Sequence, residues 1–208
     1  MNLSNKQGTV FVVSGPSGTG KGTIMEEYFK RYPHDNTFLS ISATTRSPRP
    51  SDIEGVTYYF KTKEEFEDLI ANDGLAEWAE FCGNYYGTPK KPVNDMVAEG
   101  KNVVLEIEVQ GGCSVMEKFD NAVGIFVLPP SFTELKNRLV SRNTETIDVI
   151  ESRLSRAREE IQEIDKYEYI LINDDLDKAV ETFRSILIGE SQRVIRNKNI
   201  IKEVCEIC

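Results

Sequence analysis

The chain begins with an apolar run that is followed by a helical pattern. Residues 9–14 (TVFVVS) are mostly β-branched or aromatic, which is typical of a buried strand. A glycine-rich stretch comes next, and residues 22–32 (GTIMEEYFKRY) then place apolar side chains at helical spacing. This pattern predicts a strand, a loop and a helix in that order.

The same alternation returns in the second half of the chain, where the last helical pattern carries an apolar stripe at Ala179, Phe183, Ile186 and Leu187. Strands that alternate with helices of this length predict an α/β fold with a parallel sheet and helices on both faces. We expect strands at 102–109, 122–128 and 167–173, and helices over 113–119, after 128 and over 175–197.

Two segments interrupt the alternation and divide the chain. Residues 42–92 are rich in Thr, Arg, Pro, Tyr and Gly, with one short helical pattern at 63–72, and we expect a small inserted domain there. Residues 131–162 are helical and charged, which predicts a mobile lid. The core domain would consist of residues 1–41, 93–130 and 163–208.

Composition narrows the possible functions. The chain has 208 residues, 39% hydrophobic and 28% charged, which predicts one stable domain with small insertions. The formal net charge of -9 argues against a nucleic-acid or membrane partner, because binding to either requires many Lys and Arg side chains. Any phosphate site must therefore be a local cluster of positive charge.

Targeting signals and cysteines point to an ordinary cytoplasmic protein. No apolar run is long enough to span a membrane, and the first residues lack the apolar core of a secretory signal. The 4 cysteines are too scattered to predict a disulfide framework. Cys205 and Cys208 form a CxxC pair without a second pair, and His34 is far away in sequence, so we expect no metal or redox role for them.

The loop after the first strand has the pattern of a phosphate-binding site. GPSGTGK fits G-x-x-x-x-G-K, and such a loop directs several backbone N–H groups into one concavity, while its lysine adds a full positive charge. We expect ATP to bind at Gly15, Pro16, Ser17, Gly18, Thr19, Gly20, Lys21, Gly22 and Thr23.

Gly22 stands where this pattern usually has a Ser or Thr that binds Mg²⁺. Thr23 supplies a hydroxyl one residue later, and the G-K-G-T sequence is similar to the loop of adenylate kinases, which use ATP and Mg²⁺. We expect a metal ion held chiefly by phosphates and water, because Mg²⁺ retains several waters and takes few protein ligands.

A second basic group lies in the inserted segment. Arg46 and Arg49 are close in sequence, and guanidinium groups bind phosphate oxygens in forked pairs that a hydroxyl such as that of Tyr58 can complete. Considered alone, the two arginines are explained equally well as part of a solvated loop. The phrase EWAEFCGNYYGTP adds polar candidates at Glu77, Tyr85, Tyr86 and Thr88.

Together these phrases closely resemble guanylate kinases. The strand-loop-helix unit is followed by SATTRSPR, EWAEFCGNYYGT and LEIEVQG, in the order and at the spacing of that family, from about residue 8 to residue 190. The resemblance implies a P-loop NTPase-type parallel sheet flanked by helices. It also implies an inserted mixed α+β domain that binds the nucleoside monophosphate at 42–92, and a helical lid at 131–162.

The resemblance also implies roles for individual residues of the inserted domain. The phosphate of GMP would be held by Arg46, Arg49, Tyr58 and Tyr86. Guanine presents an N1–H and an N2 amine that a carboxylate accepts as a pair, whereas adenine has no such donor edge. The guanine base would be read by Ser42, Glu77, Thr88 and Glu106.

Two positions depart from the usual sequence of the family. Glu106 and Glu108 stand where L-D-I-D is more common, which keeps both charges but adds a methylene to each side chain. The implied metal ligands are Glu108 and Thr23. Residues 51–55 (SDIEG) replace the usual G-E-x-x-G in what we expect to be a turn.

The lid and the end of the last strand would complete the ATP site. The lid arginines that close over the ATP phosphates in the family match Arg138, Arg142 and Arg153. Arg156 and Arg158 are instead expected to form ion pairs on the helix surface, such as Arg156 with Glu160. Asn173 would lie beside adenine, and Asp174 or Asp175 would cap the closing helix.

The implied reaction is transfer of the γ-phosphoryl group of ATP to GMP, giving ADP and GDP in purine nucleotide metabolism. Such transfer depends on charge stabilisation, so we expect no side-chain nucleophile and no covalent intermediate. ATP and GMP would be the partners of a monomer or homodimer, with Mg²⁺ as cofactor. The catalytic residues would be Lys21, Arg46, Arg142 and Arg153.

Two alternatives remain open at this point. Guanylate-kinase-like domains of scaffolding proteins bind phosphopeptides without catalysis, but they have lost parts of the nucleotide machinery, whereas this chain keeps Lys21, Arg46 and Arg49. A kinase for another phosphorylated acceptor, such as a sugar phosphate, would have no guanine edge for Glu77 and Thr88 to read.

Overall fold

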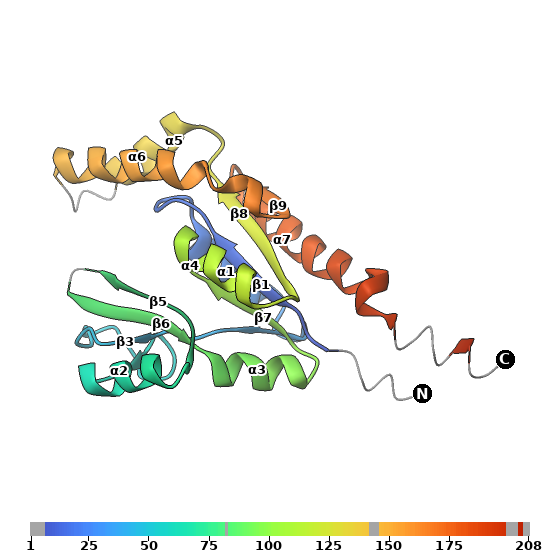
Figure 1. Cartoon of the computed structure of the whole chain (residues 1–208). Coiled ribbons are helices and arrows are strands. Elements are labelled where there is room, and N and C mark those ends of the chain that lie inside the picture. The colour runs from blue at the N-terminus through green and yellow to red at the C-terminus, as the bar shows by residue number, and fades with distance from the viewer. Residues whose placement is uncertain (1–6, 82, 142–145, 199–203, 206–208) are drawn as a thin grey trace.

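A five-stranded sheet forms the centre of the computed structural model, which describes residues 7–81, 83–141, 146–198 and 204–205. The strand order is β2-β7-β1-β8-β9, and all neighbouring strands are parallel (Figure 1). This confirms the predicted parallel sheet. The strands are β1 (Val10–Ser14), β2 (Thr37–Leu39), β7 (Asn102–Glu106), β8 (Ala122–Leu128) and β9 (Tyr169–Ile172).

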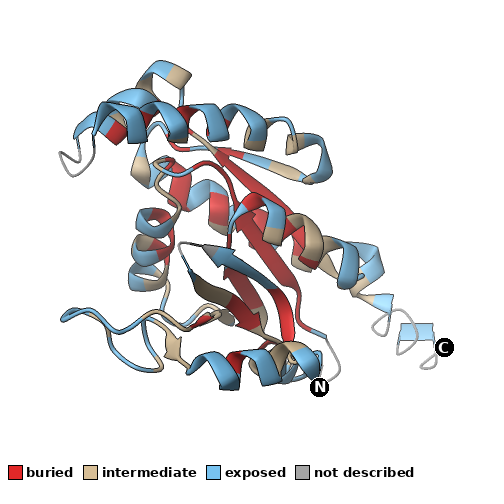
Figure 2. Ribbon diagram, turned by 60° about the vertical axis from the view of Figure 1, so that its left-hand side comes forward, coloured by how far each residue is buried: buried red, intermediate tan, exposed pale blue. Residues whose placement is uncertain are grey.

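Helices cover both faces of this sheet, as predicted. They are α1 (Lys21–Arg31), α3 (Lys90–Ala98), α4 (Val109–Lys118) and α7 (Leu176–Ser191). Phe11 and Val13 of β1 belong to the core formed with α1 and α7, while Val10 and Val12 belong to the core formed with α3 and α4. All residues of β1 are buried, which explains its unbroken apolar run, and Figure 2 shows the buried residues concentrated in the central strands.

A second, smaller sheet packs below the first in Figure 1, next to α2 (Lys63–Ala71). Its strand order is β4-β3-β6-β5, with β5 and β6 antiparallel. Thr62 begins α2 with a capping box, and its hydroxyl accepts a hydrogen bond from the backbone of Glu65. The strands are β3 (Ala43–Thr44), β4 (Tyr59–Phe60), β5 (Leu75–Phe81) and β6 (Asn84–Pro89).

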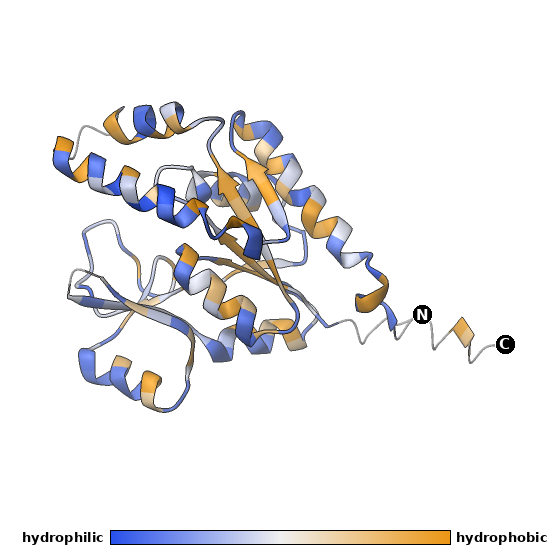
Figure 3. Ribbon diagram, turned by 45° about the horizontal axis from the view of Figure 1, so that its top comes forward, coloured by the Kyte–Doolittle hydropathy of each residue, from blue (hydrophilic) through white to orange (hydrophobic). Residues whose placement is uncertain are grey.

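Two further helices, α5 (Phe132–Ser141) and α6 (Ile147–Ile161), lie together at the top of Figure 1 and are followed by η1 (Ile164–Lys166). They pack on each other through a core of their own, and Figure 3 shows hydrophobic and hydrophilic residues mixed along both helices. No helix in the described ranges is long and apolar enough to cross a bilayer. The core of the pair consists of Leu135, Leu139, Ile150, Leu154 and Ala157.

The structure also corrects some predicted element limits. β7 ends at Glu106 and α4 begins at Val109, so the strand is shorter and the helix starts earlier than predicted from 102–109 and 113–119. The predicted domain boundary at residue 92 lies inside α3. Neither α3 nor β2 was predicted from the sequence. The domain limits as a whole remain a prediction.

Candidate active site

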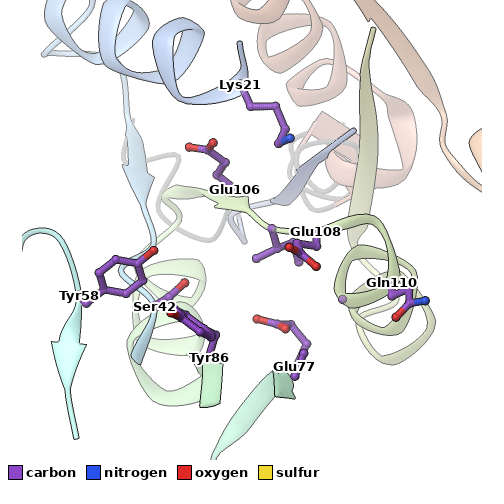
Figure 4. A pocket seen from close by; sticks show the side chains of 12 residues that line it. Lys21, Ser42, Tyr58, Glu77, Tyr86, Glu106, Glu108 and Gln110 are labelled. Atoms are coloured by element: carbon purple, nitrogen blue, oxygen red, sulfur yellow. The ribbon is translucent and has the colours of Figure 1, made fainter. Parts of the chain in front are cut away.

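A cavity of about 400 Å³ opens where the carboxyl ends of the central strands face the small sheet. Figure 4 shows Lys21 and Glu106 on one side of it, with Glu77 and Tyr86 on the other. Its lining includes the first residue of α1, parts of β5 and β6, the end of β7 and the start of α4. The lining residues are Lys21, Ser42, Tyr58, Glu77, Ala79, Tyr86, Gly87, Glu106, Ile107, Glu108, Gln110 and Gly111.

The predicted phosphate loop lies between β1 and α1, in the context that its pattern requires. Gly20 begins α1 in the left-handed region with φ 90°, and no side chain caps the helix there, so the N–H groups of its first turn are available to an anion. The Lys21 ammonium folds back along the loop, where Nζ donates to the carbonyls of Gly15 at 2.6 Å and Pro16 at 3.2 Å.

Asn173 and Arg138 support this loop through hydrogen bonds. The Asn173 side chain is buried and its Nδ2 donates to the Thr19 carbonyl at 2.8 Å. Arg138 Nη2 donates to the Asn173 carbonyl at 2.9 Å, and its Nε pairs with Glu134 at 2.8 Å. Both residues therefore support the phosphate loop in this structure, and the predicted contact of Asn173 with adenine remains a prediction.

The turn after Asn173 caps α7, as one of the two predicted alternatives requires. Asp175 is the N-cap residue, and its carboxylate accepts a hydrogen bond from the Lys178 backbone at 2.9 Å. The capping role of this turn is confirmed.

Arg46 is held by an acidic partner and packs against Tyr58, which lines the cavity. Its Nη2 donates to Asp52 Oδ2 at 2.9 Å, and the same oxygen accepts a bond from the backbone N–H of Arg49 at 2.7 Å. The Arg49 bond, together with Arg46, holds the pKa of Asp52 below its ordinary value against the effect of burial. The Arg46 guanidinium also lies 5.5 Å from the ring centroid of Tyr58, whose hydroxyl has a pKa raised by burial.

Glu77 and Thr88 form a buried pair on neighbouring strands. The two residues are register partners of β5 and β6, and the Thr88 hydroxyl donates to Glu77 Oε1 at 2.7 Å. Burial raises the pKa of Glu77, although the bond from Thr88 opposes this change. Ser42 and Tyr86 line the same cavity. The family resemblance implied that Ser42, Glu77 and Thr88 read the base and that Tyr86 holds the phosphate. Ser42, Glu77 and Tyr86 line one cavity, and their roles remain predictions.

Glu106 ends β7 and Glu108 is the N-cap of α4, and the two exposed residues have different neighbours. The Glu106 carboxylate lies close to the phosphate loop, with Oε1 3.5 Å from the position that a Cβ on Gly22 would occupy. Partial loss of solvent raises the pKa of Glu106, although the residue remains exposed, and Lys21 lowers it. Glu108 is exposed, and Oε2 pairs with Arg156 Nη2 of α6 at 2.5 Å.

Helices α5 and α6 carry further arginines, and one of them reaches the phosphate loop. Arg153 Nη1 donates to the Ser17 hydroxyl at 3.5 Å. Arg156 pairs with Glu160 at 2.9 Å, which confirms the predicted surface ion pair, and it also reaches Glu108. Arg158 packs instead over the Phe132 ring, 4.5 Å from its centroid. Arg142 was predicted to bind ATP and lies outside the described residues.

Sequence reasoning missed several residues of the site. Gln110 and Gly111 line the cavity because α4 begins earlier than predicted, and Asp52 was interpreted only as part of a turn. The available signal for Asp52 was its position three residues after Arg49. In the described ranges no group of three or more His, Cys, Asp or Glu side chains could hold a metal ion by itself. Cys205 is a free, exposed thiol, and Cys208 lies outside those ranges.

Known proteins share this sequence and fold. The family model described as guanylate kinase matches residues 7–190. A guanylate kinase of Bacillus anthracis is 50% identical over 206 residues, covering 98% of this chain and 99% of the relative. A guanylate kinase of Desulfitobacterium hafniense is 44% identical over 202 residues, with 97% and 100% covered.

A solved structure agrees with the sequence relatives. The crystal structure of guanylate kinase from Anaplasma phagocytophilum superposes with a TM-score of 0.75 at 32% identity and covers 93% of this chain and 92% of that one. The family match, the nearly full-length relatives and the shared fold all agree with the resemblance seen in the sequence. The chain belongs to the guanylate kinase family.

Proposed function

We propose that the cavity beside the phosphate loop is the GMP site of an ATP:GMP phosphotransferase. This kinase transfers the γ-phosphoryl group of ATP to GMP and forms ADP and GDP. The observation that carries the assignment of the site is the buried Glu77–Thr88 pair, which lies in the same cavity as the loop lysine.

Glu77 can distinguish guanine from adenine by its charge and burial. An ionised carboxylate accepts the N1–H and the N2 amine of guanine as a pair. Adenine would leave the buried carboxylate without these donors, and an unmade bond of this kind costs about 1–3 kcal/mol or more. Thr88 holds one oxygen of Glu77, which fixes the direction of the other, and Ser42 and Glu106 supply further polar groups around the base.

The cations around the cavity would hold the phosphates in line. We assign the GMP phosphate to Arg46, Arg49, Tyr58 and Tyr86, since the first is pre-ordered by Asp52 and packs against Tyr58 of the cavity lining. Lys21 and Arg153 would meet the charge that develops on the transferred group, together with Arg142. Because the transfer needs charge stabilisation and orientation, no covalent enzyme intermediate is involved.

Mg²⁺ is the expected cofactor, and the donor set suits it. The groups near the loop are oxygen donors, Thr23 and the carboxylates of Glu106 and Glu108, and they are too few to hold a metal alone. Mg²⁺ typically takes one or two protein carboxylates and completes its shell with phosphates and water. Thr23 and Glu108 would hold it, and when bound it neutralises charge on the β- and γ-phosphates.

The remaining assignments follow from composition and are proposals. A net charge of -9 supports a protein without nucleic-acid or membrane partners, acting in the cytoplasm as a monomer or homodimer. The scaffold-type binding module and a kinase for another acceptor are not favoured, because full-length relatives are guanylate kinases.

A coupled assay of ADP formation tests the proposed site directly. GMP, AMP, UMP and CMP are compared as acceptors at fixed ATP and Mg²⁺, and kcat/KM should be highest for GMP by about 10-fold or more. Turnover of AMP as efficient as that of GMP would contradict the role of Glu77. An absence of turnover with all four acceptors would favour the binding-module alternative.

A further inference from the structure

Gly111 lies against the carboxylate of Glu77 at the start of α4. A Cβ built on Gly111 would be 2.9 Å from Oε2, 3.3 Å from Cδ and 3.5 Å from Cγ of Glu77. Such a distance to Oε2 is shorter than real Cβ contacts, so any side chain at this position would push the carboxylate away. By contrast, a Cβ on Gly189, in the last part of α7, would meet nothing within 4 Å.

Other neighbours hold the Glu77 carboxylate in one position. Oε1 is held by the Thr88 hydroxyl at 2.7 Å, and only 9% of the residue surface is exposed. The backbone of Glu77 is fixed by the pairing of β5 with β6. The carboxylate therefore occupies the space between Thr88 on one side and Gly111 on the other.

The position beside Gly111 also suits a negative charge. Glu108 is the N-cap of α4, so Gly111 belongs to the first turn of a 10-residue helix, where the helix carries a partial positive charge. A buried carboxylate is otherwise disfavoured in its ionised form, and close approach to this turn reduces the cost. A glycine is the residue that permits the closest approach.

We propose that Gly111 is a specificity-determining residue, because the absence of a side chain there lets Glu77 stand where it reads the guanine edge. The inference rests on the proposed role of the cavity as the GMP site. A methyl group at position 111 would displace the Glu77 carboxylate by a few tenths of an ångström or rotate it, and a paired hydrogen bond tolerates neither well. GMP recognition would weaken, while the ATP loop would be untouched.

The effect on folding should be small or opposite in sign. Glycine inside a helix is less favourable than alanine, so Gly111→Ala increases helix propensity. The clashing atom is at the end of a flexible side chain, which can move without a change in the backbone. A loss of GMP recognition without a loss of stability would therefore indicate that the substitution displaces the Glu77 carboxylate and does not disturb the fold.

The test compares Gly111→Ala with Gly189→Ala in the full chain. KM for GMP, KM for ATP, the ratio of kcat/KM for GMP to that for AMP, and Tm are measured for both. Gly111→Ala should raise KM for GMP by about 10-fold and lower the GMP preference, with KM for ATP and Tm maintained. Gly189→Ala should match the wild type in all three kinetic values, since it keeps the same helix effect without the contact.

A second comparison keeps the test decisive. In a Glu77→Ala background the contacting carboxylate is gone, so adding Gly111→Ala should leave KM for GMP unchanged. An equal additional loss in that background would overturn the proposal, and so would a KM for GMP within about 2-fold of the wild type in the single variant. Failure of the proposed function is separate, because it would show in the wild type as equal use of GMP and AMP.

Discussion

Replacing Glu77 with glutamine tests guanine recognition, and the structure indicates how the amide would sit. Thr88 donates its hydroxyl to Oε1, and a glutamine can keep this bond only with its carbonyl toward Thr88. Its NH₂ group would then face the donor edge of guanine. In the reversed orientation the Thr88 hydroxyl proton would lose its acceptor, and Thr88 is 1% exposed. Either orientation leaves a buried polar group unpaired.

The expected loss follows from that unpaired group. An unsatisfied buried donor costs about 1–3 kcal/mol, which corresponds to about a 5- to 150-fold rise in KM for GMP. KM for ATP should not change, because the phosphate loop is separate from Glu77. Glu80→Gln is the matched control, since Glu80 is an exposed residue of the same strand. Steady-state kinetics with GMP varied, then ATP varied, give both constants.

Stability and pH provide independent readouts of the same substitution. Burial raises the folded-state pKa of Glu77, so its protonated form stabilises the fold below the ordinary carboxyl pKa, and this stabilisation is lost as pH rises through the raised value. At neutral pH Glu77→Gln should therefore keep or increase Tm. KM for GMP of the wild type should rise as pH falls through the raised pKa, and the variant should lack that step. A normal KM for GMP in Glu77→Gln would refute the reasoning.

Three other substitutions test separate parts of the molecule. Lys21→Ala should lower kcat by about 10²–10³-fold, and unchanged single-turnover rates would remove Lys21 from the phosphate site. Asp52→Asn should raise KM for GMP by about 3- to 10-fold, because Arg46 must then be ordered on binding; a lower KM would show instead that the Asp52 charge repels the phosphate. Glu190→Gln should lower Tm by a few degrees, measured by calorimetry, because a carboxylate with 0% exposure loses charge-assisted bonds from Tyr169 and Arg196. Burial raises the pKa of Glu190, but those bonds outweigh it and leave the pKa low, so its stabilisation is present above the unfolded carboxyl pKa and should fade as pH falls through the folded value.

Local patterns in the sequence were sufficient for the phosphate loop and for four strands of the central sheet, but not for β2. The strand at 10–14 is buried on both faces, and a continuous apolar run that ends in glycines is a strong local signal. α3 and the start of α4 gave no comparable signal. α4 is capped by Glu108 without a side-chain bond and contains two glycines in its first half, which lowers helix propensity. α3 has a proline at its N-cap and another inside its first turn.

The parts of the site that escaped prediction are contacts between distant segments. Arg156 and Glu108 are 48 residues apart, and nothing local in either segment indicates the pair. The approach of Gly111 to Glu77 likewise depends on how α4 packs against β5. Residue types in a motif therefore predicted which groups bind the substrates, whereas the groups that position them became visible only in three dimensions.

The two ends of the proposed GMP site differ in how firmly they are attached to the central sheet. Ala76 belongs to the core of the central sheet, and the Lys118 side chain of α4 donates to its carbonyl at 3.2 Å, so the beginning of β5 is anchored there. Glu77 is the next residue, so its backbone position is fixed as well. Arg46 lies at the other end, in the loop after β3 of the small sheet, whose own buried cluster in the described ranges consists of Ala43, Phe66 and Leu75. Since a small core permits motion at low cost, we expect the base to be read by a preformed site and the phosphate to be captured by a part of the protein that moves.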